Sequence, residues 1–256
     1  MPTRTLDEIT SETIKKTERV KNMKIKAILF DSGRVLNHPR TGHWFIPPNF
    51  YKYIDKPVFE KQGTDVLQKV FQICLKRLDE QDYVLTEQEE YELFVEFYSE
   101  FADQLPQLQL TKTEIECIAY DTVYNDEKFL FHDDVFDVIP RLSAAYKLGV
   151  VSDTWPSLER VFVNLNLRNY FSSFVMSSIL GVRKPNELMY MTALKELNVN
   201  PNEVIFVDDN IHNLEGAKKL GIHTVWLLRG SEEVINGDYK SIKDLFEFER
   251  LLEGTL

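Results

Sequence analysis

Three aspartates stand at the ends of apolar runs that read as buried strands. Asp31 closes the run ILFD, and the pair Asp208 and Asp209 closes the run IFVDD. Carboxylates brought together without partners repel one another, so such a group calls for a cation. Carboxylate oxygens suit Mg²⁺, which keeps several of its waters and often bridges to phosphate. The sequence therefore predicts a magnesium site built from these aspartates.

A hydroxyl and a lysine extend this set. Ser152 and Asp153 end another apolar run, and Lys184 precedes a helical pattern in GVRKPNELMY. Ligands in open α/β sheets bind at the carboxyl ends of the strands, so we expect these side chains at one rim. Singly, each has an ordinary interpretation as a turn former, a helix cap or a solvated lysine. Their joint occurrence favours a site for an anion and a metal.

The elements that must position these residues alternate along the chain. Strands are predicted at 25–31, 148–153, 171–178, 203–209 and 223–228, and helices at 134–146, 156–166, 186–198, 211–220 and from about Ser241. Strands that are apolar on both faces, alternating with amphipathic helices, indicate a parallel sheet covered on both sides. We therefore expect an α/β fold, a Rossmannoid parallel sheet of at least five strands.

Residues 41–130 have a different pattern. Three helical periodicities follow a stretch rich in proline and aromatic residues, and two of them start with capping boxes, Thr86 with Glu89 and Thr111 with Glu114. The expected organisation is an N-terminal extension at 1–23, an α/β core at 24–40 and 131–256, and an all-helical insertion at 41–130. The aromatic residues Trp44, Phe45 and Tyr51 are candidates to line a pocket beneath the insertion.

The composition of the chain argues against some classes of function. The chain has 256 residues and a net charge of −11, with 43% hydrophobic residues. An acidic chain without a basic stripe argues against nucleic-acid binding, and no apolar run approaches the roughly 20 residues that span a bilayer. Cys74 and Cys117 are read as free thiols of a cytoplasmic protein. A monomer or a homodimer is expected.

The order Asp31, Ser152, Lys184 and Asp208-Asp209 resembles the four motifs of the haloacid dehalogenase-like (HAD) hydrolase superfamily. The resemblance spans about residues 24–228, and the helical insertion resembles the C1 cap of subfamily I. In addition, FDSGRVL is similar to the FDxGxV variant of motif I found among bacterial sugar-phosphate phosphatases. The resemblance implies hydrolase activity, with Mg²⁺ as the cofactor.

The resemblance also implies residue roles. Asp31 would be the nucleophile that forms an aspartyl-phosphate, while Ser152 and Lys184 would contact the transferring phosphoryl group. The metal ligands would be Asp31, the backbone carbonyl of Gly33 and Asp209, with Asp208 as a second ligand or an orienting group. The residues expected to bind substrate are Ser32, Gly33, Arg34, Ser152, Asp153 and Lys184.

Gly33 departs from the usual family pattern. Most phosphatases of the family carry a second aspartate there, whose acid–base help is worth roughly 10²–10⁴-fold. Its absence leaves three readings: a phosphatase that obtains the proton elsewhere, a metal-independent haloacid dehalogenase, or a weakly active protein that binds a phosphorylated ligand. His38 and His43 are candidate substitutes for the missing acid.

The acidic pair Asp208 and Asp209 favours the first of these readings, because dehalogenation needs no metal. The expected activity is that of a Mg²⁺-dependent phosphatase acting on a small-molecule phosphate ester, with a sugar phosphate as one candidate substrate. The sequence does not identify the substrate further.

Overall fold

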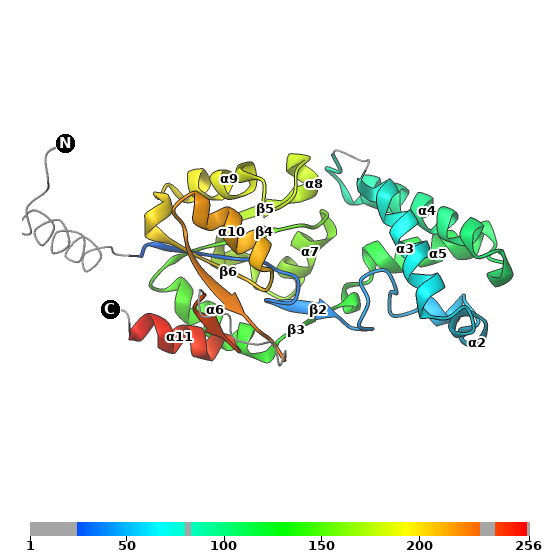
Figure 1. Cartoon of the computed structure of the whole chain (residues 1–256), viewed down its shortest axis with the longest axis horizontal. Coiled ribbons are helices and arrows are strands. Elements are labelled where there is room, and N and C mark those ends of the chain that lie inside the picture. Colours follow the sequence, from blue (N-terminus) through cyan, green and yellow to red (C-terminus); the bar gives the residue numbers. More distant parts are fainter. Residues whose placement is uncertain (1–24, 80–82, 231–238, 255–256) are drawn as a thin grey trace, which may run out of the picture.

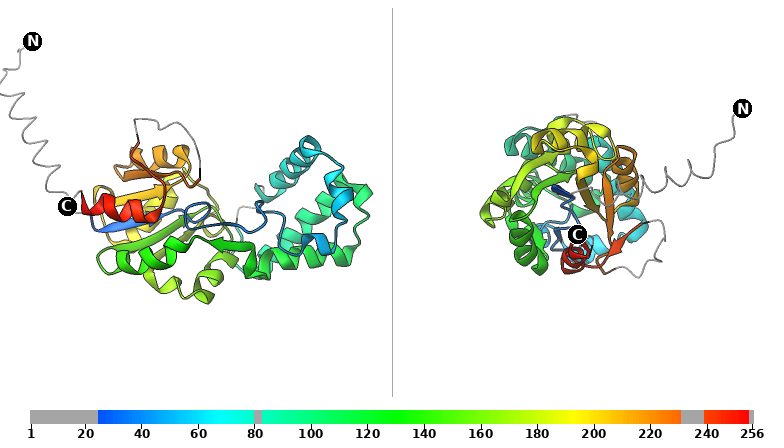
Figure 2. Two further views of the ribbon diagram at one scale, coloured as in Figure 1. Left: turned by 90° about the horizontal axis from the view of Figure 1, so that it is seen from below. Right: turned by 90° about the vertical axis from the view of Figure 1, so that its left-hand side faces the viewer.

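The computed structural model describes residues 25–79, 83–230 and 239–254. The extension predicted at 1–23 lies outside the described residues. Two lobes are visible: a sheet with helices on both sides, and a second lobe made of helices that projects beyond one end of the strands (Figures 1 and 2). The sheet lobe contains both the first and the last of the described residues. The helical lobe is inserted into it after the first strand.

The first lobe is organised by a parallel six-stranded sheet in the order β5-β4-β1-β6-β7-β8. Its strands are β1 (Ala27–Phe30), β4 (Lys147–Ser152), β5 (Phe171–Met176), β6 (Val204–Asp208), β7 (His223–Leu227) and β8 (Ser241–Ile242). The predicted α/β class and parallel sheet are therefore confirmed. Because β1 lies between β4 and β6, the predicted site residues at their ends become neighbours.

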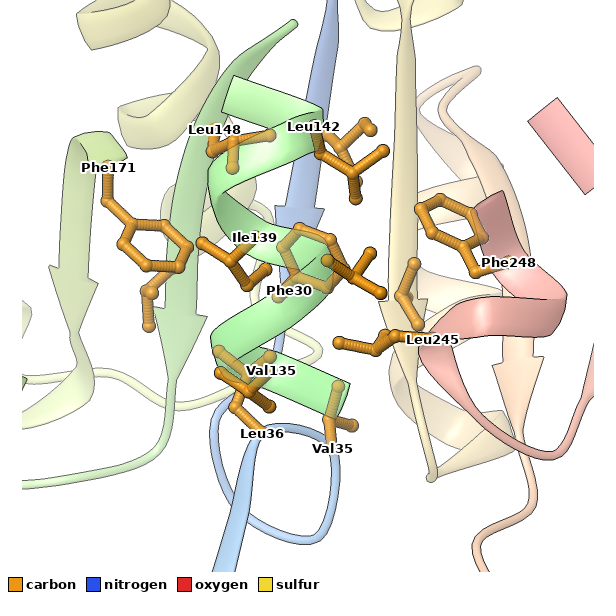
Figure 3. Close-up of a cluster of buried hydrophobic side chains, with 14 of the residues drawn as sticks. Phe30, Val35, Leu36, Val135, Ile139, Leu142, Leu148, Phe171, Leu245 and Phe248 are labelled. Carbon is orange, nitrogen blue, oxygen red and sulfur yellow. The ribbon is translucent and has the colours of Figure 1, made fainter. Parts of the chain in front are cut away.

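Helices cover both faces of the sheet. One face carries α6 (Asp133–Ser143), α7 (Ser157–Asn164) and α11 (Leu245–Glu253), and the other carries α9 (Glu187–Leu197) and α10 (Ile211–Lys219). Side chains alternate along β1 accordingly: Ile28 and Phe30 join the first cluster, and Ala27 and Leu29 join the second. Figure 3 shows Phe30 between α6 and α11. Its ring packs edge-to-face against that of Phe248, with 5.9 Å between the ring centroids.

The prediction of a helix from about Ser241 is wrong at its start. Residues Ser241 and Ile242 form β8, which pairs with Trp226 and Leu227, and α11 begins only at Leu245. The side chain of Asp244 accepts a hydrogen bond from the backbone N–H of Glu247 and so caps the helix. The pairing with β7 is a tertiary contact that the local helical periodicity could not reveal.

The second lobe is helical. It contains α2 (Lys56–Glu60), α3 (Thr64–Asp79), α4 (Glu87–Gln104) and α5 (Lys112–Tyr124), and both predicted capping boxes are formed. Its own cluster of buried side chains, centred on the aromatic residues of α4, is separate from the two clusters of the sheet lobe. An antiparallel ribbon of β2 (Asn37–Pro39) and β3 (Phe129–Phe131) carries the chain out to this lobe and back.

The shorter elements complete the described chain. They are α8 (Ser177–Leu180) and the 3-10 helices η1 (Phe50–Lys52), η2 (Pro106–Leu108), η3 (Asp126–Lys128), η4 (Arg168–Tyr170) and η5 (Pro201–Glu203). The boundary predicted at residue 130 falls inside β3, and the limits of the two domains stay predictions. Among the described residues, no helix combines the length and the apolar character needed to cross a membrane.

Direct contacts hold the two lobes together beside the strand ends. Glu90 on α4 is fully buried and accepts hydrogen bonds from the backbone N–H and the hydroxyl of Ser157, at 2.8 and 2.7 Å. Arg160 on α7 reaches the carboxylate of Glu87 at 2.9 Å. These contacts place the helical lobe over the rim of the sheet.

Candidate active site

The carboxyl ends of the three central strands bring the predicted residues to one rim. Phe30 on β1 is in register with Val150 on β4 and Val207 on β6, so Asp31, Ser152 and Asp208 follow at neighbouring positions. The backbone N–H of Asp31 donates to the carbonyl of Val207 at 2.9 Å and continues the ladder by one bond. The side chains of all three are buried, as their position between covered strands requires.

Lys184 joins this rim from the loop before α9. Its ammonium lies 2.7 Å from Oδ1 of Asp31 and 2.9 Å from Oδ2 of Asp208, with only 1% of its side chain exposed. Its backbone N–H donates to the carboxylate of Asp153 at 2.9 Å, which fixes this part of the loop. The ion pairs make Lys184 the central charge of the site.

The loop that carries Lys184 packs tightly against α10. A Cβ added to Gly216 would lie 2.5 Å from Cβ of Pro185, so only glycine permits this approach. The peptide bond between Lys184 and Pro185 is cis. The packing of Pro185 against Gly216 therefore helps to position the ammonium of Lys184, in addition to its ion pairs with Asp31 and Asp208.

Burial and mutual repulsion shape the charges of the rim. Burial disfavours the ammonium of Lys184, but the carboxylates of Asp31 and Asp208 more than offset that penalty and raise its pKa. Burial, opposed by Lys184 and reinforced by Asp31, raises the pKa of Asp208 to about 7. Burial and the charge of Asp31 also raise the pKa of Asp209. A further cation would stabilise the ionised carboxylates.

Asp31, Asp208 and Asp209 each offer a carboxylate oxygen within 4.8 Å of the others, a spacing that one metal ion could bridge with small side-chain movements. The three differ in how their oxygens are used. Both oxygens of Asp208 accept hydrogen bonds, from Lys184, the backbone N–H of Asn210 and the amide of Asn213. Asp209 has a looser partner, the guanidinium of Arg34 at 3.7 Å.

The loop after β1 folds back on itself. Arg34 adopts a left-handed backbone conformation with φ of 59°, and the amide of Asn37 donates to the hydroxyl of Ser32 at 2.6 Å. Arg229, after β7, donates to the carbonyl of Val35 at 2.8 Å and holds this loop from behind. These contacts fix the residues that follow Asp31.

A cavity of about 290 Å³ lies between this rim and the helical lobe. We call its two sides the sheet side and the aromatic side. The sheet side presents Asp31, Ser32, Gly33, Arg34, Ser152, Asp153, Lys184 and Asp209, and the aromatic side presents Trp44, Phe45, Phe94, Phe129 and Trp155. The structure thus brings together the predicted site residues, and it leaves Asp208 behind them as the partner of Lys184.

Of the residues that the sequence suggested for secondary roles, some line the cavity and others do not. Trp44 and Phe45 line it, whereas Tyr51 packs with Phe50 and Phe59 of the helical lobe. Neither suggested histidine lines it: His38 faces His132, and the ring of His43 lies 4.4 Å from that of Phe71.

Sequence reasoning missed several polar residues of this region, among them Thr154 and Ser157. Asn37 and Lys128 line the cavity, and Glu90 joins the two lobes next to it. Glu90 lies in the run EQEEYEL and Lys128 in the run NDEKFLF, where neighbouring charges suggest an exposed surface. Both runs end in apolar residues, but that signal of burial is weak.

Relatives of this chain include enzymes that act on different bonds. It is 33% identical to glyceraldehyde 3-phosphate phosphatase of Pyrococcus furiosus over 112 residues, which are 42% of this chain and 47% of the relative. It is 32% identical to (S)-2-haloacid dehalogenase 4A of Burkholderia cepacia over 100 residues, 38% of this chain and 43% of the relative. The chain spans about half the length of the curated relatives it matches.

Solved structures share the fold over nearly the whole chain. A HAD phosphatase from Thermococcus onnurineus superimposes with a TM-score of 0.60 at 23% identity, covering 89% of this chain and 98% of the other. The L-2-haloacid dehalogenase from Xanthobacter autotrophicus gives 0.61 at 19% identity, covering 91% and 100%. Both likenesses establish the fold, which phosphatases and dehalogenases share.

The family follows from a match that covers most of the chain. The family model described as "Haloacid dehalogenase-like hydrolase" matches residues 64–227, a range that contains Ser152, Lys184 and Asp208-Asp209. Together with the parallel sheet and the rim of carboxylates around a buried lysine, this match shows that the chain belongs to the haloacid dehalogenase-like hydrolases.

Proposed function

We propose that this protein is a magnesium-dependent phosphatase that hydrolyses a small phosphate ester through a phosphoryl group carried on Asp31. The observation that carries the proposal is the set of three carboxylates around one buried ammonium. A halide leaves carbon as a stable anion and needs neither a metal nor a proton. A set of three acids therefore favours phosphoryl transfer over dehalogenation.

The residues of the rim suit Mg²⁺. The carboxylates of Asp31 and Asp209, with the backbone carbonyl of Gly33, would hold the ion. Asp208, whose oxygens are occupied by Lys184, Asn210 and Asn213, would orient the set. When bound, Mg²⁺ neutralises negative charge on the phosphoryl oxygens. Carboxylate and carbonyl oxygens are the donors that this ion prefers.

The chain's own residues supply the two chemical steps. A carboxylate oxygen of Asp31 attacks phosphorus, the bond from phosphorus to the ester oxygen breaks, and the leaving oxygen takes a proton from solvent. Water then attacks the phosphorus of the aspartyl-phosphate, which releases inorganic phosphate and restores the carboxylate. The hydroxyl of Ser152 and the ammonium of Lys184 stabilise the phosphoryl oxygens in both steps.

Position 33 sets the leaving group that this site can process. A Cβ on Gly33 would lie 3.4 Å from the indole of Trp44, in van der Waals contact, so a second acid here would lie beside the aromatic side. Without that acid, esters whose leaving oxygen has a low pKa, such as acyl, anomeric and aryl phosphates, should react fastest. A cavity of about 290 Å³ admits a small metabolite.

The test is phosphate release from p-nitrophenyl phosphate with and without Mg²⁺, beside halide release from 2-chloropropionate. We expect phosphate release that EDTA abolishes and that Asp31→Asn reduces by about 10⁴-fold or more, the order found when a covalent nucleophile is removed. Halide release that persists in EDTA would instead identify a dehalogenase. Mg²⁺-dependent binding of phosphate without turnover would identify a binding protein.

A further inference from the structure

Lys128 is a buried cation on the cavity wall that the proposed mechanism does not use. It ends η3, just before β3, and its ammonium lies 4.8 Å from the ring centre of Phe129 and 6.0 Å from that of Phe94. Both rings belong to the aromatic side of the cavity. The ammonium is therefore placed on the aromatic side, within a wall that otherwise consists of rings.

Within the described part of the chain, the charge of Lys128 has no direct counter-ion. Its hydrogen-bond partner is the carbonyl of Thr122, and none of the ion pairs among the described residues includes it. An ammonium has three donors, so this carbonyl leaves donor capacity unused. Burying a charge without a partner is costly, and the adjacent rings compensate only part of that cost.

The acids whose charges act on Lys128 are all held by other groups. Both oxygens of Glu90 accept from Ser157, and those of Asp126 accept from Arg160 and Asn164. The oxygens of Asp121 accept from the backbone and amide of Asn49 and from Asn125. Burial lowers the pKa of Lys128, and these carboxylates oppose that effect from a distance without contacting the ammonium. Lys128 is itself one of the residues that line the cavity.

We propose that Lys128 binds a second anionic group of the substrate, at the end opposite the phosphoryl group, so that the preferred substrates are small phosphorylated carboxylic acids. The sheet side would take the phosphate and the aromatic side the carbon skeleton, with Lys128 pairing with a carboxylate. This assignment rests on the proposed phosphatase function and names the substrate class of the same site.

The test compares 3-phosphoglycerate with glycerol 3-phosphate, which differ by a carboxylate in place of a hydroxymethyl group. Affinities are measured by calorimetry with Mg²⁺ in the Asp31→Asn variant, so the result does not depend on turnover. We expect at least tenfold tighter binding of 3-phosphoglycerate, a ratio that falls to about one in Asp31→Asn/Lys128→Gln and is largely kept in Asp31→Asn/Lys128→Arg. Lys112→Gln, which removes an exposed lysine of the same lobe, is the matched control and should leave the ratio unchanged.

Three outcomes would overturn the assignment. One is equal affinity for the two ligands in Asp31→Asn, a result that needs no Lys128 variant and so stands even if Lys128→Gln fails to fold. Another is a tenfold preference that Lys128→Gln leaves intact. The third is the same loss in Lys112→Gln, which would point to a general effect of charge. If both ligands bind as expected but wild-type protein with Mg²⁺ releases no phosphate from p-nitrophenyl phosphate, the phosphatase proposal fails and the assignment of Lys128 survives.

Discussion

On the sheet side of the cavity, Lys184 contacts Asp31 and Asp208 within 2.9 Å, and Asn210 and Asn213 hold Asp208 in turn. On the aromatic side, Lys128 lies among rings and donates to a single carbonyl. Both lysines are buried, yet among the residues that the structure describes only Lys184 has direct counter-ions. The contrast suggests that the sheet side is organised before the substrate arrives, whereas the aromatic side is completed by it.

The strongest way to break this contrast is to remove the central charge of the sheet side. Lys184→Met leaves two buried carboxylates without their ion pair, and it removes a cation from the phosphoryl site. We expect kcat to fall by about 10³-fold, because a buried electrostatic contact to the transferring group is lost. The free energy of unfolding should also drop by about 3 kcal/mol, measured by urea denaturation. Lys219→Met, on the exposed surface of α10, is the control, and an equal loss there would refute the account.

The missing acid offers a way to sharpen the contrast. Gly33→Asp alone should raise the hydrolysis of alkyl phosphates less than the double variant does, because its Cβ would already contact Trp44 at 3.4 Å and limit how the carboxyl can turn. In Gly33→Asp/Trp44→Ala, the carboxyl has room to protonate the leaving oxygen. The measured quantity is the rate of glycerol 3-phosphate hydrolysis divided by the rate of p-nitrophenyl phosphate hydrolysis. We expect this ratio to be up to about 10²-fold higher in the double variant than in Trp44→Ala. If Gly33→Asp alone gave the full gain, Trp44 would not be what limits an acid at this position.

The contact between the lobes can be weakened without touching either side of the cavity. Glu90→Gln keeps the shape of the side chain but removes the charge that accepts two hydrogen bonds from Ser157. We expect the free energy of unfolding to fall by about 2 kcal/mol, the value of hydrogen bonds to a buried charged group. Glu92→Gln, at an exposed position of the same helix, should change it by less than about 0.5 kcal/mol. Equal effects of the two variants would show that the contact is not stabilising.

The smallest expected effect is on the free energy of unfolding, and it comes from His132, which directly follows β3 of the ribbon between the lobes. Burial, together with Arg229 and His38, lowers the pKa of His132 from 6.5 to about 4. A histidine whose pKa is lowered by folding contributes stability that is present above pH 6.5 and lost as the pH falls toward 4. Since the ring is partly exposed, we expect a loss of about 1 kcal/mol between pH 7.5 and 5.

In His132→Phe this part of the pH dependence should disappear, which urea denaturation at the two pH values would detect. Carboxylates titrate over the same range in both proteins, so the difference between the two curves is the quantity of interest. An unchanged pH dependence in the variant would mean that His132 titrates alike in the folded and unfolded chains.

The difference between the sheet side and the aromatic side also explains how much of the site could be predicted from the sequence. Asp31, Ser152 and Asp208 end apolar strands, and parallel strands bring their ends together, so the sheet side follows from local patterns and chain order. Lys184 adds a loop, but it precedes a proline and a helix in a recognisable motif. Periodicity and turn residues therefore indicated the α/β class, the five longer strands and the members of the rim.

The aromatic side was harder to predict because it depends on contacts between segments far apart in the chain. Lys128 is buried by Phe94 and Phe129, and Glu90 by Ser157, 67 residues later. Neither burial leaves a periodic signal in a run of charged residues. Strand β8 escaped for the same reason, since two residues paired with β7 carry no pattern of their own.

The central claim is that Asp31 carries the phosphoryl group, and trapping that group tests it most directly. Wild-type protein is mixed with p-nitrophenyl phosphate and Mg²⁺, quenched in acid during turnover, digested, and mapped by mass spectrometry. We predict a phosphoryl group on the peptide that contains Asp31, absent in Asp31→Asn and when EDTA replaces Mg²⁺. Turnover that continues in Asp31→Asn, or a phosphoryl group on another residue, would contradict the account.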